Sequence, residues 1–234
     1  RLFESPTGKE GPMLETERFI LRPWRDSDAP TLFRWASDPR VGPPANWKPY
    51  TSIEHCREVI HAVYRVPETY AICLKRPEEV DLAAIARVEA AADFGDIARG
   101  FSGRAFLRER KRVETAPLNP IGSIRFVKPA HANCEIGHNE REMGIWLAVP
   151  FWGQGIAPEA AGEMLHYGFD AMRLSAIWVC NFVENTTSAR AKDKLGFELV
   201  RLEEATNPIT GVVRTQQVSV LTKSSWEGMQ KATE

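Results

Sequence analysis

Apolar residues alternate with polar ones, or run together, in seven short stretches bounded by turn-forming residues, and this pattern predicts β-strands. The predicted strands cover residues 18–24, 69–75, 120–128, 142–149, 175–180, 197–204 and 212–222. Four other stretches predict helices, and in two of them, residues 26–36 and 158–171, apolar residues recur at helical spacing. The predicted helices cover residues 26–36, 51–64, 158–171 and 186–195. The resulting order of elements indicates a mixed α/β fold around one central sheet.

Three local signals mark helix ends. Thr51 and Glu54 have the spacing of a capping box and predict a helix start. Pro158 suits the first position of a helix, where its missing N–H costs nothing. Gly196 stands where a left-handed cap ends a helix.

The remaining segments suggest how the chain is organised. Residues 1–12 are rich in Gly, Pro and charge and predict a flexible lead-in. Residues 13–225 are expected to form one domain, with an extra insertion of helix and loop at about 78–117 and a tail at 226–234. Five basic residues between 104 and 112 indicate a solvated face; the alternatives are contact with an acidic partner or with ribosomal RNA.

Charge and composition narrow the class of protein. The 234 residues carry a formal net charge of −1, with a pI near 6.6, which argues against general binding to nucleic acid or to anionic membranes. The sequence shows no apolar run of the roughly 20 residues that a membrane helix needs. Four scattered cysteines without a C-x-x-C pair suggest a reducing compartment. We therefore expect a cytoplasmic protein that does not bind a membrane.

The stretch FWGQGIAPEA, residues 151–160, places Gly153 and Gly155 between a predicted strand and a predicted helix. Such a turn presents backbone N–H groups to an anion, and the helix dipole adds to the attraction. The alternative is a tight turn that needs small residues for packing. A dinucleotide-binding site requires the motif G-x-G-x-x-G, but here Gly153 and Gly155 are followed by Ala157 and Pro158, without the third glycine. The P-loop motif is also absent from the sequence.

Two further groups of polar residues are of types that can bind a ligand or a metal ion. Asn185 and Ser188 follow the strand predicted at 175–180, where they either cap the next helix or contact a ligand. The segment HANCEIGH, residues 131–138, offers two histidines, a cysteine and Glu135, but its spacing fits no standard zinc site. We expect a loop there and no metal.

Two motifs together resemble the GNAT superfamily of acyl-CoA N-acyltransferases: WLAVPFWGQGIAPEA, followed by VENTTSARAKDKLGF. The opening LETERFILRPWRDSDA, residues 14–29, resembles the RimJ/RimL-like branch, which acetylates the N-termini of ribosomal proteins. The resemblance covers residues 14–75 and 120–222, with the motifs in the family's order.

The resemblance implies a mostly antiparallel sheet in which strands 142–149 and 175–180 splay apart to admit acetyl-CoA, the co-substrate. Backbone groups of Leu147, Ala148 and Val149 would pair with the pantetheine arm, and Asn185 would reach it. The N–H groups of the glycine turn would hold the pyrophosphate. These groups belong to Gly153, Gln154, Gly155, Ile156 and Ala157.

The resemblance also implies direct attack of a neutral amine on the thioester, with a strand N–H near Leu147 or Ala148 for the oxyanion. Many family members use a Tyr acid where this chain has Lys192, so Ser188 becomes the candidate that protonates the departing thiolate. The candidate general base is Glu142, with Glu135 as second choice. Each of these carboxylates is equally typical of a solvated strand end.

Trp47 and Tyr50 lie in a Pro-rich loop, where they either line the acceptor pocket or cover the core. The amine acceptor is a protein N-terminus, a lysine or a small amine, and the protein acts as a monomer or a homodimer. The alternative function is an inactive acyl-CoA sensor or interaction module of the same fold.

Overall fold

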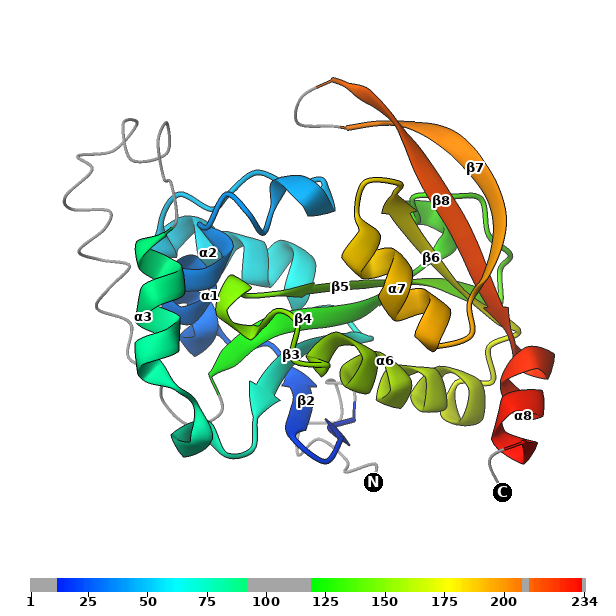
Figure 1. Cartoon of the computed structure of the whole chain (residues 1–234), viewed down its shortest axis with the longest axis horizontal. Helices are drawn as coiled ribbons and strands as arrows, with labels where there is room; N and C mark the ends of the chain where they lie inside the picture. The colour runs from blue at the N-terminus through cyan, green and yellow to red at the C-terminus, as the bar shows by residue number, and fades with distance from the viewer. Residues whose placement is uncertain (1–11, 92–118, 208–210, 233–234) are drawn as a thin grey trace. The chain divides into compact units, whose positions relative to one another are not determined.

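The computed structural model describes residues 12–91, 119–207 and 211–232. Its strands are β1 (Leu14–Glu15), β2 (Phe19–Pro23), β3 (Thr69–Leu74), β4 (Pro120–Val127), β5 (Glu140–Leu147), β6 (Ala176–Phe182), β7 (Glu198–Thr206) and β8 (Val213–Thr222). Its α-helices are α1 (Ala29–Ala36), α2 (Ile53–Val59), α3 (Leu82–Ala90), α6 (Ile156–His166), α7 (Thr186–Lys194) and α8 (Lys223–Lys231). The predicted mixed α/β fold is confirmed (Figure 1).

The eight strands are hydrogen-bonded in the order β1-β2-β3-β4-β5-β6-β8-β7. Pairing is antiparallel between β1 and β2, β2 and β3, β6 and β8, and β7 and β8, whereas β5 and β6 are parallel. The sheet is therefore mostly antiparallel, as expected. None of the helices in the described ranges is long and apolar enough to span a bilayer.

The chain forms two compact units. The N-terminal unit contains residues 1–123 and 146–156, and the C-terminal unit contains residues 124–145 and 157–234. Strands β4 and β5 each contribute residues to both units.

The core of the N-terminal unit lies around α1, α2 and β3, and it includes Trp24, Leu32 and Phe33. A buried ion pair fixes the start of α1, because both Arg22 and Asp28 are 3% exposed and their two hydrogen bonds measure 2.7 and 2.8 Å. Breaking a buried pair of this kind leaves an uncompensated charge, which is costly.

The C-terminal unit is built on β6, β8 and β7, with α6, α7 and α8. The hairpin of β7 and β8, drawn in orange and red in Figure 1, confirms the predicted C-terminal hairpin. Gly196 has φ of +81°, which confirms the predicted left-handed cap after α7.

Two predicted helix starts are wrong by one or two residues. Helix α2 is capped by Ser52, whose side chain accepts from the His55 N–H, so Thr51 is not the capping residue. Helix α6 begins at Ile156, which makes Pro158 its third residue. The proline is still tolerated, because the first four N–H groups of a helix have no intrahelical partner.

The segment that we expected as a tail contains helix α8. Its N-terminus is capped by Thr222, which accepts from the Ser225 N–H, and Trp226 is buried. The Trp226 ring stacks on Phe169 at 5.7 Å and meets His166 edge-on at 4.8 Å. This aromatic contact, made with a distant segment, explains why the short polar helix is stable.

Candidate active site

The glycine turn joins β5 to α6. Strand β5 ends at Leu147, a 3-10 helix follows at Val149–Phe151, and the turn leads into α6 at Ile156. Gly153 and Gly155 have φ of +75° and +73°, the left-handed region that glycine adopts without strain. The exposed turn therefore holds its backbone in a conformation that needs glycine at two positions.

Side chains within the turn fix its shape. The Trp152 indole N–H donates to the Leu147 carbonyl at 2.8 Å, although the ring is 46% exposed. The Gln154 amide donates to the Pro150 carbonyl at 2.8 Å. Both hydrogen bonds join the turn to residues four or five positions earlier, so its conformation is stabilised by local contacts that need no ligand.

Arg18 places a positive charge beside the turn. Its Nη1 donates to the Gln154 carbonyl at 3.0 Å, and its Nη2 lies 3.6 Å from where a Cβ on Gly155 would be. Residues 18 and 154 are 136 positions apart, so no sequence spacing signalled this contact. An exposed guanidinium, two left-handed glycines and a helix start together form an arrangement that suits a phosphate-bearing ligand.

One predicted oxyanion donor is already engaged. The Ala148 N–H donates to the Ile121 carbonyl at 2.8 Å, so Ala148 is wrong as an oxyanion donor and Leu147 remains. The carbonyls of Ala148 and Val149 accept from the N–H groups of Phe151 and Trp152 within the 3-10 helix. Of the three residues predicted to pair with the pantetheine arm, Ala148 and Val149 therefore use backbone groups within the protein. Leu147, the last residue of β5, is the better candidate for this pairing.

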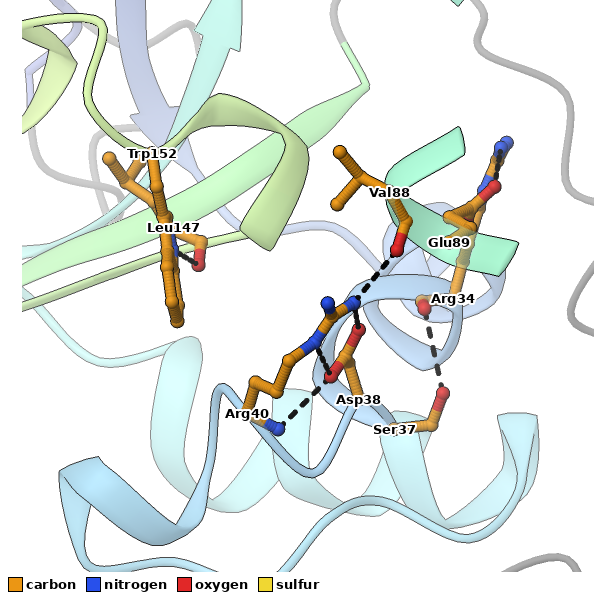
Figure 2. A network of polar contacts seen from close by, with 8 residues as sticks. All are labelled: Arg34, Ser37, Asp38, Arg40, Val88, Glu89, Leu147 and Trp152. Atoms are coloured by element: carbon orange, nitrogen blue, oxygen red, sulfur yellow. Dashed lines mark hydrogen bonds and ion pairs between the residues drawn. The ribbon is translucent and has the colours of Figure 1, made fainter. Parts of the chain in front are cut away.

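Helix α3 of the insertion packs beside this segment, against the 3-10 helix Val149–Phe151. Figure 2 shows its two anchors to the α1 region: Arg34 binds Glu89 at 3.0 Å, and Arg40 donates to the Val88 carbonyl at 3.1 Å. Asp38 holds the Arg40 guanidinium in place through two hydrogen bonds. The basic run at 104–112 lies outside the described residues.

Aromatic side chains gather in the N-terminal unit around Trp146 of β5. Trp47 lies 4.8 Å from Tyr50 and 6.0 Å from Trp146, and the Trp146 N–H donates to the Tyr64 hydroxyl at 3.2 Å. Tyr50 is buried and shares a hydrogen bond with Tyr64, so it belongs to the core. Trp47 is only partly buried, which leaves it as the better candidate for an acceptor pocket.

In the C-terminal unit, β5 and β6 stay paired for only three residue pairs, which end at Glu142 and Trp178. Strand β6 continues to Phe182, paired with β8. Just beyond the paired part, the Asn181 Oδ1 is buried and has no hydrogen-bond partner in the described structure. A buried acceptor of this kind is costly unless a ligand or water satisfies it.

Asn185 and Ser188 occupy the first turn of α7. The Asn185 Oδ1 accepts from the Ser188 N–H at 3.1 Å, so Asn185 caps the helix and its amide nitrogen remains for a ligand. Lys192, one turn after Ser188 on the same helix, is buried and donates to Gln217 at 2.6 Å and Ser219 at 2.8 Å. Burial lowers the pKa of its ammonium, partly opposed by Asp193.

Glu142 is not the solvated carboxylate of a strand end, because only 3% of it is exposed. Its Oε1 accepts from the Asn133 side chain at 2.8 Å, and its Oε2 accepts from the Asn133 backbone N–H. Burial raises the pKa of this carboxyl, while the bonds from Asn133 and the charge of Arg125 oppose that effect. A raised pKa moves a carboxylate toward the range useful for a general base.

Glu135 and the segment 131–138 differ from Glu142. Glu135, His131 and His138 are exposed, and the described ranges contain no group of three His, Cys, Asp or Glu side chains that suits a metal ion. Arg18, Asn133 and Asn181 are candidate site residues that the sequence did not indicate. Only their polarity was visible in the sequence, because their partners come from other elements.

Comparisons with known proteins agree with this picture. A family model described as "Acetyltransferase (GNAT) domain" matches residues 18–198. The chain is 27% identical over 187 residues to "Uncharacterized N-acetyltransferase YoaA" of Bacillus subtilis (strain 168), covering 80% of this chain and 83% of that protein. It is 28% identical over 128 residues to "Putative ribosomal N-acetyltransferase YdaF" of the same organism, covering 50% and 67%.

A solved structure with a similar fold is the acetyltransferase (GNAT family) from Bacillus anthracis. Its TM-score is 0.64 at 18% identity, and the match covers 91% of this chain and 99% of that one. At this identity the likeness concerns the fold.

Proposed function

Because the chain belongs to the acetyltransferase (GNAT) domain family, we propose that it transfers the acetyl group of acetyl-CoA to a primary amine. The observation that carries the proposal is the glycine turn, where Gly153 and Gly155 adopt left-handed backbone and Arg18 lies alongside. This turn suits the pyrophosphate of coenzyme A, because backbone N–H groups and a guanidinium both bind phosphate oxygens.

The residues of the C-terminal unit suit the rest of the cofactor. The pantetheine arm carries amide groups, and the orphaned Asn181 Oδ1 and the remaining Asn185 amide are suited to bind them. When bound, acetyl-CoA supplies the activated thioester, and the protein supplies positioning and proton transfer.

In the reaction that we propose, the neutral amine attacks the thioester carbonyl directly. The Leu147 N–H is our candidate to stabilise the oxyanion, since the Ala148 N–H is occupied. Glu142 takes the proton of the amine, directly or through water, and Ser188 protonates the departing thiolate. Lys192 is held in hydrogen bonds to Gln217 and Ser219, which supports a structural role for it.

For the acceptor, we propose the N-terminus of a ribosomal protein, in the cytoplasm. Residues 14–29 resemble the RimJ/RimL-like branch, and the YdaF relative carries a ribosomal N-acetyltransferase name. The partly buried Trp47 beside Trp146 offers an apolar surface for the first side chain of such a peptide.

Calorimetry with acetyl-CoA tests the cofactor assignment. Arg18→Ala removes a charge-assisted contact of about 1.5–3 kcal/mol, so Kd should rise at least about tenfold. Arg57→Ala is the matched control, because Arg57 is an exposed arginine bound to Glu54 in α2. If the wild-type protein fails to bind acetyl-CoA at high micromolar concentration, the proposal is wrong.

One observation favours the alternative of an acyl-CoA sensor without turnover: both Glu142 oxygens already accept hydrogen bonds from Asn133. A thiol-release assay separates the two functions. The enzyme should release coenzyme A thiol fastest with peptides that have a free N-terminus. Release should be slower with two control amines, an N-acetylated peptide that keeps one lysine and spermidine. Binding of acetyl-CoA with thiol release no faster than the blank for every amine would favour the sensor.

A further inference from the structure

Three polar side chains from three strands lie on one face of the sheet in the C-terminal unit. In the strand registers, Glu142 of β5 lies opposite Trp178 of β6. Gln216 of β8 lies between Phe182 of β6 and Glu203 of β7. Residues opposite each other share a face, and so do residues four apart in one strand. Glu142, Gln216 and Glu203 therefore lie on the same face, all within one compact unit.

Asn133, in the segment between β4 and β5, joins Glu142 to Gln216 across β6. Its side chain donates to Glu142 Oε1 at 2.8 Å, and its backbone N–H donates to Oε2 of the same carboxylate. Its carbonyl accepts from Gln216 Nε2 at 3.1 Å. One residue thus contacts both oxygens of the buried carboxylate and is itself held from the other side of β6.

The Gln216 amide is itself fixed in orientation. Its nitrogen donates to the Asn133 carbonyl and also to Glu203 Oε1, at 2.7 Å. Both partners can only accept, so the end of the side chain that faces them must be the NH2 group, which has one hydrogen for each. Gln216 is 3% exposed, and Arg201 in turn donates to Glu203 at 2.7 Å. The strands around Gln216 therefore determine where its donors point.

Asn133 needs a support of this kind. The residue is exposed, and its segment, residues 132–139, which the structure describes in full, lies outside the helices and strands. Exposed segments without regular structure open more readily than paired strands do. The Gln216 amide comes from the interior of a strand that is paired on both sides, and it holds the segment at the residue that contacts Glu142.

We propose that Gln216 and Asn133 are positioning residues for acetyl transfer: Gln216 holds the Asn133 backbone, and Asn133 orients the Glu142 carboxylate toward the amine. Each carboxylate oxygen has a second lone pair, so an oxygen that accepts from Asn133 can still take up the proton that the amine loses. The two donors fix the direction of that lone pair, and proton transfer needs a short, aligned contact. This role rests on the proposed function, in which Glu142 is the base.

Amide hydrogen exchange, measured by NMR on the full-length protein, tests the contact apart from any activity. Gln216→Met keeps the length of the side chain and removes the donor, so the Asn133 N–H should exchange at least about tenfold faster. Gln217→Met is the matched control, because Gln217 is the next residue of β8 and its side chain accepts from Lys192 at 2.6 Å on the other face. This variant should leave the exchange of Asn133 unchanged. Equal exchange of Asn133 in Gln216→Met and the wild type overturns the proposal.

Kinetics test the consequence for the reaction. Gln216→Met should lower kcat about tenfold and leave the Kd for acetyl-CoA unchanged, whereas Gln217→Met should keep kcat within about twofold of the wild type. In a Glu142→Gln background, Gln216→Met should change kcat less than about twofold, because a residue that acts through Glu142 then has no base to position. The same tenfold loss in both backgrounds would show a general structural effect and overturn the proposal.

Asn133→Ala is a second variant, at an exposed residue where folding is not at risk. It removes the side-chain donor and keeps the backbone contact, so kcat should fall about three- to tenfold. Asn139→Ala is its matched control, since this exposed asparagine of the same segment donates to the Arg173 carbonyl at 3.0 Å, and its kcat should stay within about twofold of the wild type. An unchanged kcat in Asn133→Ala overturns the proposal and leaves acetyl transfer standing. If the wild-type protein acetylates no amine, the proposed function is wrong and this role falls with it, whatever the exchange rates show.

Discussion

Replacing Gly155 by alanine tests whether the left-handed turn is what binds the cofactor. A Cβ at position 155 would meet only Arg18 Nη2, at 3.6 Å, which is ordinary van der Waals contact. The cost therefore comes from the backbone: φ is +73°, and the left-handed conformation costs a non-glycine residue about 1–2 kcal/mol. In a chain of this size, this loss corresponds to a melting temperature about 2–8 °C lower.

Gly162 provides the matched control for the same chemical change. It lies within α6, and nothing lies within 4 Å of its would-be Cβ. Alanine there should stabilise the protein by about 0.5–1 kcal/mol, since glycine in a helix loses more backbone entropy on folding. Urea unfolding followed by circular dichroism measures both variants.

Calorimetry then separates binding from stability. On the proposed function, Gly155→Ala tilts the N–H groups that would bind the pyrophosphate, so Kd for acetyl-CoA should rise about tenfold, whereas Gly162→Ala should bind as the wild type does. The reasoning is refuted if both variants change stability in the same direction. It is also refuted if Gly155→Ala is destabilised and still binds acetyl-CoA with unchanged affinity.

Three further predictions concern other residues. Asp28→Ala removes the carboxylate of a buried ion pair and should cost about 3–5 kcal/mol in urea unfolding, whereas Asp26→Ala, at a carboxylate 53% exposed, should cost at most about 1 kcal/mol. Glu142→Gln should lower kcat about 10²–10⁴-fold and leave the Kd for acetyl-CoA unchanged. In the wild type, kcat/KM should fall as the pH drops through the raised pKa of this carboxyl. If Glu135→Gln shows this loss and Glu142→Gln does not, Glu135 is the general base. Trp47→Leu should raise KM for the amine about two- to tenfold and leave KM for acetyl-CoA unchanged; equal effects on both would show a role in the core.

Much of the fold was predictable because its signals are local. Strand and helix periods follow from which side chains face the core, so the order of elements and the C-terminal hairpin were found within a few residues. The turn at Gly153 and Gly155 and the cap at Gly196 were found because positive φ needs glycine, and this requirement is visible at a single position. Helix α8 was missed, since its stability depends on the contact of Trp226 with Phe169.

The site was predictable only in outline. Tertiary structure placed Arg18 beside a turn 136 residues away and used the Ala148 N–H for Ile121. It also buried Glu142 under Asn133. These outcomes depend on hydrogen bonds between distant elements, and a buried polar group takes whichever partner the packing brings to it.

The sequence by itself therefore determined the class of fold and the turn that suits a phosphate, because both follow from local backbone geometry and from periodicity. Only the tertiary structure decided which backbone N–H groups are occupied and which carboxylate is desolvated. The physical reason is that charge, burial and hydrogen bonding are properties of a residue's neighbours, and most of these neighbours are far away along the chain.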